Sequence, residues 1–456
     1  MPSRTYHTPS APSAQVAPCS TDLWESEVVP HLPADLEAQA RILGAFRRRR
    51  ALASATILLR ALLASVLVTT SLQHLACWAV VSDVADISAS AWRKRLLRSR
   101  DFLHWLVAEL LCAPPSAAQL RLFPHAGGNI LLVDATCLGQ PGGTGDDWRL
   151  HTAFNFTVGR LVQITLTDQS GGEHLGYYRL EPGDIVVCDN GYGYRRSVAL
   201  VRKQQADLVT RVRPSTFPFE HQDGTLVDVV AHLRRKGPAV RQWQGWCTDN
   251  DGERYRVRLV AAQLPPREAA EARRRARRNA SKHGRVVQES TLVVAGWVLV
   301  VTTLAQERWD AEAVLRLYRV RWQIERLFKR MKSILGLATL RGQTAASVEA
   351  SILALLVAWA VQEGTASWVR QQLAQLTGAA TRLPSSWTLT VLSVDVLRQQ
   401  VRGGWGLARL QSCLPQLQRF LTSRLRTDRE QQEIAVRQWL ERRPLSNLVF
   451  QEQELH

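Results

Sequence analysis

Two short apolar segments, each running into an aspartate, constrain the fold more than any other feature of the sequence. Residues 129–137 read NILLVDATC and residues 183–194 read GDIVVCDNGYGY, with Asp134 and Asp189 at corresponding places. Strands that are apolar at every position are buried on both faces, as neighbours within a mixed sheet are. The sequence therefore predicts an α/β fold in which both carboxylates emerge at the carboxyl edge of one sheet, where sites of such folds are built. Either aspartate could instead cap the turn after its strand.

Other strand signals surround this pair. Residues 151–169 read as two strands joined by a turn at a Val-Gly pair, and a buried strand returns at 291–304. Between them, residues 215–290 carry shorter and less regular signals, which predict a β-rich insertion. Its expected elements are strand segments at 226–233 and 255–264 and a very basic helix at 265–285.

A third acidic residue belongs to a long helix that we expect to begin after Asp310 and to end at Gly336. At about 100° per residue, four polar residues share an arc of roughly 60° beside an apolar stripe. They are Tyr318, Arg321, Glu325 and Lys332. The row is roughly 21 Å long, which suits contacts along an extended substrate. A solvated helix face with i,i+4 charge pairs, such as Arg321 with Glu325, is an equal alternative.

The charge balance indicates a polyanionic partner. The chain has 58 Lys and Arg against 40 Asp and Glu, which gives a formal net charge of +18. Such an excess favours nucleic acid over a membrane surface. A genome of high GC content would explain the use of Arg, but not the net excess.

The region from residue 21 to residue 125 reads as helical, after a Ser-, Pro- and Ala-rich start (1–20) that predicts disorder. Residues 80–99 resemble two short helices joined by a polar turn, as in a helix-turn-helix. The second of these helices carries Arg93, Lys94, Arg95 and Arg98 at its exposed positions. A helical bundle with a basic face fits nearly as well.

The expected compartment is a reducing cytoplasm. The seven cysteines are scattered, with no spacing typical of zinc sites or disulfide frameworks, and the first twenty residues lack a signal-peptide pattern. Ala61 to Val81 carries no formal charge and is long enough to span a bilayer. Because it contains several Ser and Thr residues, Gln73 and His74, we interpret it as two buried helices that meet near residues 69–71.

Tyr318, Arg321, Glu325 and Lys332 match without a gap the Y-(2)-R-(3)-E-(6)-K signature of the insertion-sequence-four family of DDE transposases. Asp134 and Asp189 stand where that family has its first two catalytic acids, and the order of elements also agrees. The chain resembles this family over roughly residues 40–360. One departure is visible, because the family usually has Arg after the second aspartate and this chain has Asn190. A phosphate contact from that position is therefore in doubt.

The resemblance implies an RNase H-like mixed-sheet core with a β-rich insertion between the second Asp strand and the Glu helix, and with N- and C-terminal helical regions. It also implies that Asp134, Asp189 and Glu325 are catalytic and hold two Mg²⁺ ions, with Mn²⁺ able to substitute. Mg²⁺ takes hard oxygen ligands, and two ions about 3.5–4 Å apart can stabilise the attacking and leaving oxygens of a phosphoryl displacement. The expected regions are a helical DNA-binding domain (21–125), the core in two parts (126–214 and 291–345), the insertion (215–290) and a C-terminal helical region (346–456).

The same resemblance assigns DNA contacts. Arg321 and Lys332 would bind phosphates, Tyr318 would donate a hydrogen bond to one, and Trp297 would stack on a flipped base. Core packing is an equal interpretation of Trp297, because it lies in an apolar strand.

The expected function is cut-and-paste DNA transposition in a prokaryotic, nucleoid-associated setting, with terminal inverted repeats and target DNA as partners. The protein would act as a homodimer in a synaptic complex, with no membrane partner. The alternatives are a catalytically silent DNA-binding protein derived from a transposase and another RNase H-like nuclease.

Overall fold

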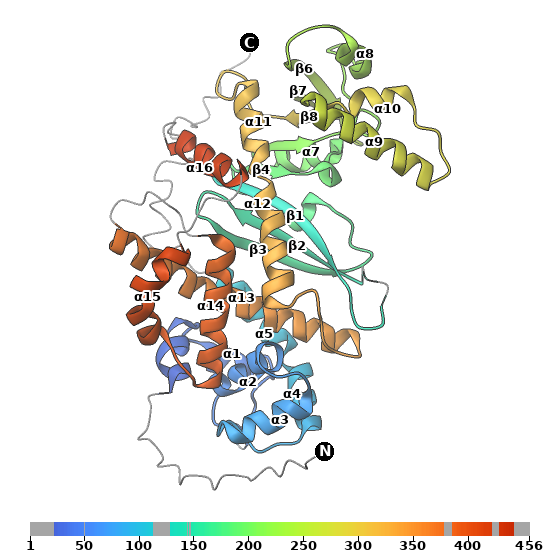
Figure 1. Cartoon of the computed structure of the whole chain (residues 1–456). Coiled ribbons are helices and arrows are strands. Elements are labelled where there is room, and N and C mark those ends of the chain that lie inside the picture. Colours follow the sequence, from blue (N-terminus) through green and yellow to red (C-terminus); the bar gives the residue numbers. More distant parts are fainter. Residues whose placement is uncertain are drawn as a thin grey trace, which may run out of the picture.

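The computed structural model describes residues 22–49, 51–112, 128–143, 145, 147–377, 385–421 and 428–441. The disorder expected for residues 1–20 lies outside these residues. Helices form both ends of the chain and a mixed sheet lies between them (Figure 1). The N-terminal helices are η1 (Trp24–Val28), η2 (Val29–His31), α1 (Leu36–Ile42), α2 (Ala55–Leu67), α3 (Leu72–Val81), α4 (Ala89–Arg98) and α5 (Arg100–Cys112).

Eight strands form a single sheet in the order β3-β2-β1-β4-β5-β8-β7-β6. Its centre is parallel, because β4 pairs with β1 on one side and with β5 on the other, whereas the remaining pairs are antiparallel. This mixed sheet confirms the predicted fold class. The strands are β1 (Ile130–Leu138), β2 (Trp148–Asn155), β3 (Arg160–Asp168), β4 (Ile185–Cys188), β5 (Asp207–Arg211), β6 (Val240–Thr248), β7 (Arg254–Gln263) and β8 (Trp297–Thr302).

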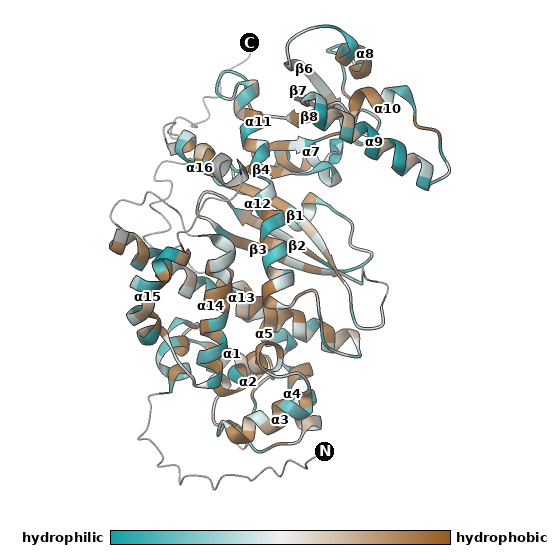
Figure 2. Cartoon of the chain, viewed as in Figure 1, coloured by the Kyte–Doolittle hydropathy of each residue, from teal (hydrophilic) through white to brown (hydrophobic). Residues whose placement is uncertain are grey.

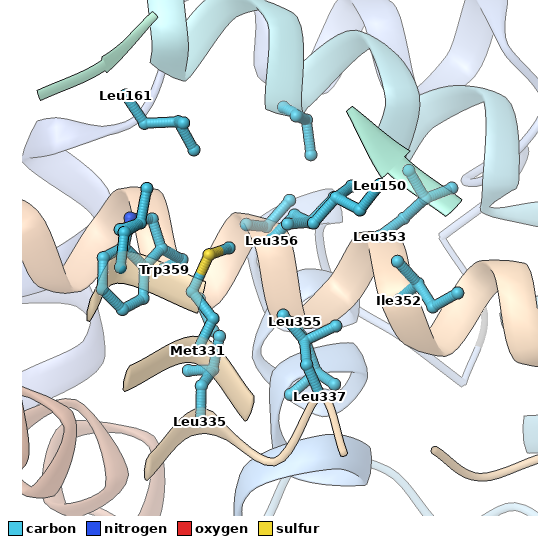
Figure 3. Packing of buried hydrophobic residues seen from close by; sticks show 14 of the residues in the cluster. Leu150, Leu161, Met331, Leu335, Leu337, Ile352, Leu353, Leu355, Leu356 and Trp359 are labelled. Atoms are coloured by element: carbon cyan, nitrogen blue, oxygen red, sulfur yellow. The ribbon is translucent and has the colours of Figure 1, made fainter. Parts of the chain in front are cut away.

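The central strands are buried on both faces, as their unbroken apolar runs predict. In β1, Ile130 and Leu132 belong to one core cluster, whereas Leu131 and Val133 belong to a second cluster on the opposite face. The first cluster also contains the buried side of α13 (Ala345–Thr377), and Figure 3 shows Leu150 and Leu161 of the sheet above residues of that helix. The central strands therefore pack through apolar side chains on both faces of the sheet.

Residues 215–290 do not form a separate sheet. Strands β6 and β7 continue the core sheet through β8, and three helices accompany them in the outer lobe of Figure 1. These helices are α8 (Val229–Arg234), α9 (Pro266–Lys282) and α10 (Glu289–Val294).

Two of the expected strand assignments are wrong. Most of 226–233 is helical because Asp228 caps α8, with its carboxylate accepting a hydrogen bond from the Ala231 amide at 2.9 Å. The first part of 291–304 belongs to α10, which has Glu289 in its first turn and ends before Gly296. In the first segment the Asp228 cap outweighs the apolar, β-branched composition, whereas α10 begins without a side-chain cap at Gln288.

The uncharged segment from Ala61 to Val81 forms two helices, as expected. Helix α2 ends at Leu67 and α3 begins at Leu72, where the Ser71 hydroxyl accepts a hydrogen bond from the His74 amide at 3.1 Å. By length and composition alone, one helix among the described residues, Ala345–Leu376 within α13, could cross a membrane. Its residues from Ser351 to Trp359 are all buried beneath the sheet, as in a core helix.

The long helix after Asp310 is interrupted. Asp310 caps it, with the Ala313 amide donating at 2.7 Å, and Gly336 ends it at a φ of 99°. Between these ends lie α11 (Ala311–Arg319), α12 (Trp322–Arg330) and the π-helix η5 (Met331–Leu335), which continue one another in Figure 1. The Arg321 amide bonds three residues back to the Tyr318 carbonyl at 3.1 Å, so the chain tightens at the junction.

The remaining elements are three helices near β4 and the helices of the C-terminal region. Short helices η3 (Leu175–Tyr177), η4 (Asn190–Tyr192) and α7 (Arg195–Lys203) flank β4, and the C-terminal region contains α14 (Ser386–Arg402), α15 (Leu407–Leu421) and α16 (Asp428–Glu441).

Candidate active site

Asp134 and Asp189 stand at equivalent places on neighbouring parallel strands. Val133 of β1 is paired with Cys188 of β4, so each aspartate is the next residue after that pair. Strand β4 ends there, whereas β1 continues to Leu138 paired with β2 alone. Asp134 therefore lies at the edge of the pairing rather than at the end of its strand, and the two carboxylates are brought together as the sequence predicts.

Strand alternation places both aspartates on the face that α12 covers. Leu132 and Val187, two residues before Asp134 and Asp189, belong to the core cluster that contains Ile324 and Leu327 of α12. Side chains two residues apart in a strand share a face. The helix with Glu325 thus packs on the side of the sheet to which the aspartates belong.

Hydrogen bonds hold both aspartates. The Tyr178 hydroxyl donates to the Asp134 carbonyl at 3.2 Å, and the Thr210 hydroxyl donates to the Asp189 carbonyl at 2.9 Å. The Asp189 carboxylate also accepts from the Gly191 amide at 2.7 Å and so caps η4. Asp189 therefore does cap the turn after its strand, and this hydrogen bond fixes its carboxylate beside the end of β4.

Arg321 connects the two acids that come from different elements. Its guanidinium lies 3.6 Å from the Asp134 carboxylate and pairs with Glu325 on the next turn of the helix. The Arg321 side chain is 16% exposed and its Nε atom is buried without a hydrogen-bond partner, whereas the Glu325 side chain is 52% exposed. A largely buried cation between two carboxylates offsets the cost of bringing them together.

Burial and neighbouring charge strongly perturb the Asp134 carboxyl. Its desolvation and, next, the charge of Asp189 raise the pKa of Asp134 to about 7, against the opposing effect of Arg321. A carboxylate in this position is stabilised by any further cation that approaches it.

The other residues of the signature also point toward this strand. The Lys332 ammonium donates to the Cys137 carbonyl of β1 at 2.8 Å, three residues after Asp134. Tyr318 is half-buried, and the Arg321 guanidinium lies 5.9 Å from the centre of its ring. Arg321 and Lys332 thus contact β1 from the helix side, and Tyr318 and Glu325 lie beside Arg321.

The structure adds a fourth acid, Glu173, that sequence reasoning missed. Its carboxylate lies against Gly191, where a Cβ atom would be 1.6 Å from Glu173 Oε2 and 3.0 Å from Asp189 Oδ1. The Asn190 Oδ1 atom, next to Asp189, is buried without a hydrogen-bond partner. Glu173 lies in a loop with no recognisable motif, so the sequence carried no signal for it.

The donor set suits a hard divalent cation. It consists of carboxylate oxygens and the unpaired amide oxygen of Asn190. The Arg321 guanidinium now lies between two of the acids, where it takes the place of a metal cation. As they stand, no three Asp, Glu, His or Cys side chains of the described residues converge closely enough to hold an ion together. The acids instead form a row of neighbours, which is what mutually repelling carboxylates do.

Trp297 lies apart from this row. It opens β8, is 6% exposed, and belongs to the core cluster on the face opposite to α12. The Arg241 guanidinium covers its ring at 4.7 Å. The core-packing interpretation describes this conformation, and stacking on a flipped base would require Arg241 to move away.

The basic residues expected on a recognition helix all lie in α4. Arg93, Lys94 and Arg98 are exposed, whereas Arg95 is half-buried and donates to the Ala91 carbonyl of its own turn at 3.4 Å. Trp92 and Leu96 of the same helix are buried. Helix α4 therefore presents three cations to solvent from a face opposite to its packed one.

Comparison with known proteins decides what this arrangement is. Residues 125–361 match the family model described as Transposase DDE domain, which spans both aspartates and Glu325. The chain belongs to the DDE transposase family. It is an insertion-sequence transposase, a metal-dependent enzyme that cuts DNA, and its relatives fit the insertion-sequence-four group within that family.

The transposase is 33% identical to the InsL transposase of insertion sequence element IS186A from Escherichia coli (strain K12), over 74% of this chain and 92% of that protein. The transposase of element IS421 from Escherichia coli shows the same identity and coverage. The transposase of element IS231F from Bacillus thuringiensis subsp. israelensis is 28% identical over 50% of this chain and 51% of that protein. DDE transposases use divalent metal ions.

Proposed function

We propose that this transposase uses Asp134, Asp189 and Glu325 to hold two Mg²⁺ ions, with Mn²⁺ able to replace them. The observation that carries the proposal is the juxtaposition of the two strand-borne aspartates with the helix-borne Glu325, joined through Arg321. When bound, such ions lower the pKa of the attacking water or hydroxyl and offset charge on the phosphate and the leaving oxygen. The protein's own part is to aim the three carboxylates and to exclude competing ligands.

Arg321 and Lys332 serve as phosphate contacts in this proposal. Both are cations whose partners in the structure are anionic or carbonyl oxygens, which are replaceable by phosphate oxygens. Once metal ions offset the acids, the guanidinium of Arg321 is free to bind the phosphate beside the scissile bond. Tyr318 donates a hydrogen bond to the same strand.

The reaction proposed is cut-and-paste transposition. The N-terminal domain binds the terminal inverted repeats through α4, with Arg93, Lys94 and Arg98 exposed on it. The core cleaves the strand at each end and joins the freed 3′-OH to target DNA. Two copies of the chain act together in a synaptic complex, in the cytoplasm and at the nucleoid.

The decisive experiment uses purified full-length protein and a plasmid that carries the whole element with its flanking DNA. We expect Asp134→Asn, Asp189→Asn and Glu325→Gln each to lower Mg²⁺-dependent cleavage by about 10³-fold or more, equivalent to about 4 kcal/mol of transition-state stabilisation, while each variant still binds the ends. Glu312→Gln is the matched control, because Glu312 is exposed and pairs only with Arg316 on α11. Undiminished cleavage by the Asp134 or Asp189 variant would refute the assignment. A wild-type chain that binds the ends but never cuts them would instead be a silent DNA-binding protein.

A further inference from the structure

The loop that carries Glu173 is held from both sides. Arg149 of β2 donates to the Gly171 carbonyl at 3.0 Å, two residues before Glu173. On the other side, His174 Nδ1 accepts a hydrogen bond from the Gly176 amide at 2.9 Å. The Tyr177 ring lies 4.2 Å from the ring of His151, which is buried in β2. A side chain on such a loop keeps a defined position, although it belongs to no helix or strand.

Gly191 provides the space that the Glu173 carboxylate occupies. A Cβ atom at residue 191 would lie 1.6 Å from Glu173 Oε2, well inside van der Waals contact. Gly191 is not among the residues with positive φ, so the backbone conformation does not require glycine. What requires it is the carboxylate above it, which makes Gly191 and Glu173 a matched pair.

Glu173 lies beside Asp189 at Gly191. Asp189 lies next to it across Gly191, and the charge of Glu173 also acts on Asp134. Arg149 is the cation that acts on Glu173, and Arg321 is already engaged by Asp134 and Glu325. The pKa of Glu173 is raised by burial of its carboxyl group and by Asp189, although the residue as a whole is exposed. Glu173 and Asp189 thus lie close to each other at Gly191 and both act by charge on Asp134, and the exposed Glu173 leaves this side open to solvent ions.

We propose that Glu173 supplies a carboxylate oxygen to the coordination shell of the divalent ion bound by Asp189. This inference rests on the proposed function and deepens it, because it adds a fourth acid to the three that the family signature names. Glu173 and Glu325 then approach the aspartates from opposite sides, one from a clamped loop and the other from α12. Gly191 does not bind the ion, but its missing side chain leaves the space that the Glu173 carboxylate occupies.

The test measures metal binding rather than activity. Mn²⁺ is titrated into the full-length protein without DNA, and free Mn²⁺ is followed by electron paramagnetic resonance. We expect Glu173→Gln to weaken Mn²⁺ affinity by about 10-fold or more, as loss of a supporting ligand typically does. Gly191→Ala, which displaces the carboxylate, should weaken it similarly, and the double variant should be no weaker than either single variant. Glu181→Gln is the control, because this nearby glutamate has a 66% exposed side chain and pairs only with Arg179.

The outcomes separate this inference from the proposed function. Normal Mn²⁺ affinity of Glu173→Gln, together with lost affinity of Asp189→Asn, would remove Glu173 from the shell and leave the three-acid site standing. Normal affinity of both variants, or no Mn²⁺ binding by the wild-type protein, would overturn both assignments. Thermal melting without metal shows whether Gly191→Ala is folded; if it is not, Glu173→Gln decides the question alone, since it removes a charge without changing the side-chain volume.

Discussion

Lys332 links the helix to the strand that carries Asp134 through a single contact. Its ammonium donates to the Cys137 carbonyl, three residues after Asp134, across a separation of 195 residues in sequence. An ammonium group is a compact charge on a flexible stem with three donors. It can therefore keep one bond to the strand and still turn another N–H toward a phosphate.

We expect Lys332→Met to lower the rate of the first nick by about 10–100-fold, because a hydrogen bond to a charged group contributes about 1.5–3 kcal/mol. End binding should change only slightly, since Lys332 is one of 58 Lys and Arg residues in the chain. Single-turnover nicking and gel-shift titration measure the two quantities. Lys329→Met is the matched control, because Lys329 is exposed on α12 and its ammonium lies 5.8 Å from the Trp387 ring. Equal nicking rates for the two variants would show that Lys332 has only a structural role.

At the residue scale, the acidic residues that could be found from the sequence were those that belong to a regular pattern. Asp134 and Asp189 were detectable because each follows an unbroken apolar run, and Glu325 because it lies in a spaced signature. Glu173 was not detectable, because its position depends on Arg149 holding the loop and on the missing side chain of Gly191. Neither feature produces a regular spacing of residues in the sequence.

Helix α9 carries a strongly basic outer surface. Its Ala269 is buried, and Arg273 connects it to α10 through a hydrogen bond to the Leu292 carbonyl at 3.1 Å. The outer side is strongly hydrophilic (Figure 2). In the part of the chain that the structure describes, no ion pair involves the exposed arginines of this helix, which are Arg267, Arg274, Arg275, Arg277 and Arg278. Such a face suits contact with a DNA backbone, and a solvated helix is the alternative.

We therefore expect Arg274→Gln/Arg278→Gln to weaken DNA binding and to flatten its dependence on salt. Each phosphate contact contributes about 0.9 to the slope of log affinity against log salt concentration, so losing two contacts should lower the slope by roughly 1.8. Binding to a duplex between 50 and 200 mM salt measures it. The control is Arg179→Gln/Arg316→Gln, which removes the same charge from two arginines that already face Glu181 and Glu312. Equal slopes for the two double variants would mean that α9 is a solvated helix.

At the element scale, a helix cap explains one place where the apolar pattern predicted the wrong element. The apolar run at 226–233 resembles a strand, but Asp228 starts a helix there. The helix predicted from Asp310 to Gly336 has the expected ends, yet it tightens between Tyr318 and Arg321. A pattern of apolar residues does not show that interruption, because the tightening depends on how the helix packs onto the sheet.

For the whole molecule, the order of elements was predictable but the sheet order was not. Most strands have a local signal, although none was expected at β5 or β6, and β5 pairs with β8 from the other side of the insertion. The insertion was expected to be β-rich, and the structure joins its strand β7 directly to β8 of the core. Pairing between distant segments is set by the tertiary fold as a whole, so no single stretch of sequence reveals it.

The continuity of the sheet makes the insertion part of the support for the active-site helix. Arg258 of β7 is 2% exposed, and one of its nitrogens donates to the Leu304 carbonyl at 3.2 Å and to the Trp309 carbonyl at 2.6 Å. Its other terminal nitrogen donates to Gln242 of β6 at 2.9 Å. Arg258 thus connects the inserted strands to the loop that leads into α11.

Removing this arginine should destabilise the core as well as the insertion. Arg258→Met keeps a similar side-chain volume but leaves buried carbonyl groups without donors, at about 1–3 kcal/mol for each, so we expect a loss of about 3 kcal/mol. Urea unfolding followed by tryptophan fluorescence measures it. Arg256→Met is the matched control, because Arg256 is exposed two residues away on the same strand. If the insertion were an independent unit, Arg258→Met would create a separate early transition and leave the main one unchanged. A single transition shifted to lower urea would show instead that the inserted strands and the active-site sheet fold as one body, so that sequence changes in the insertion act on catalysis through the position of α11 and α12.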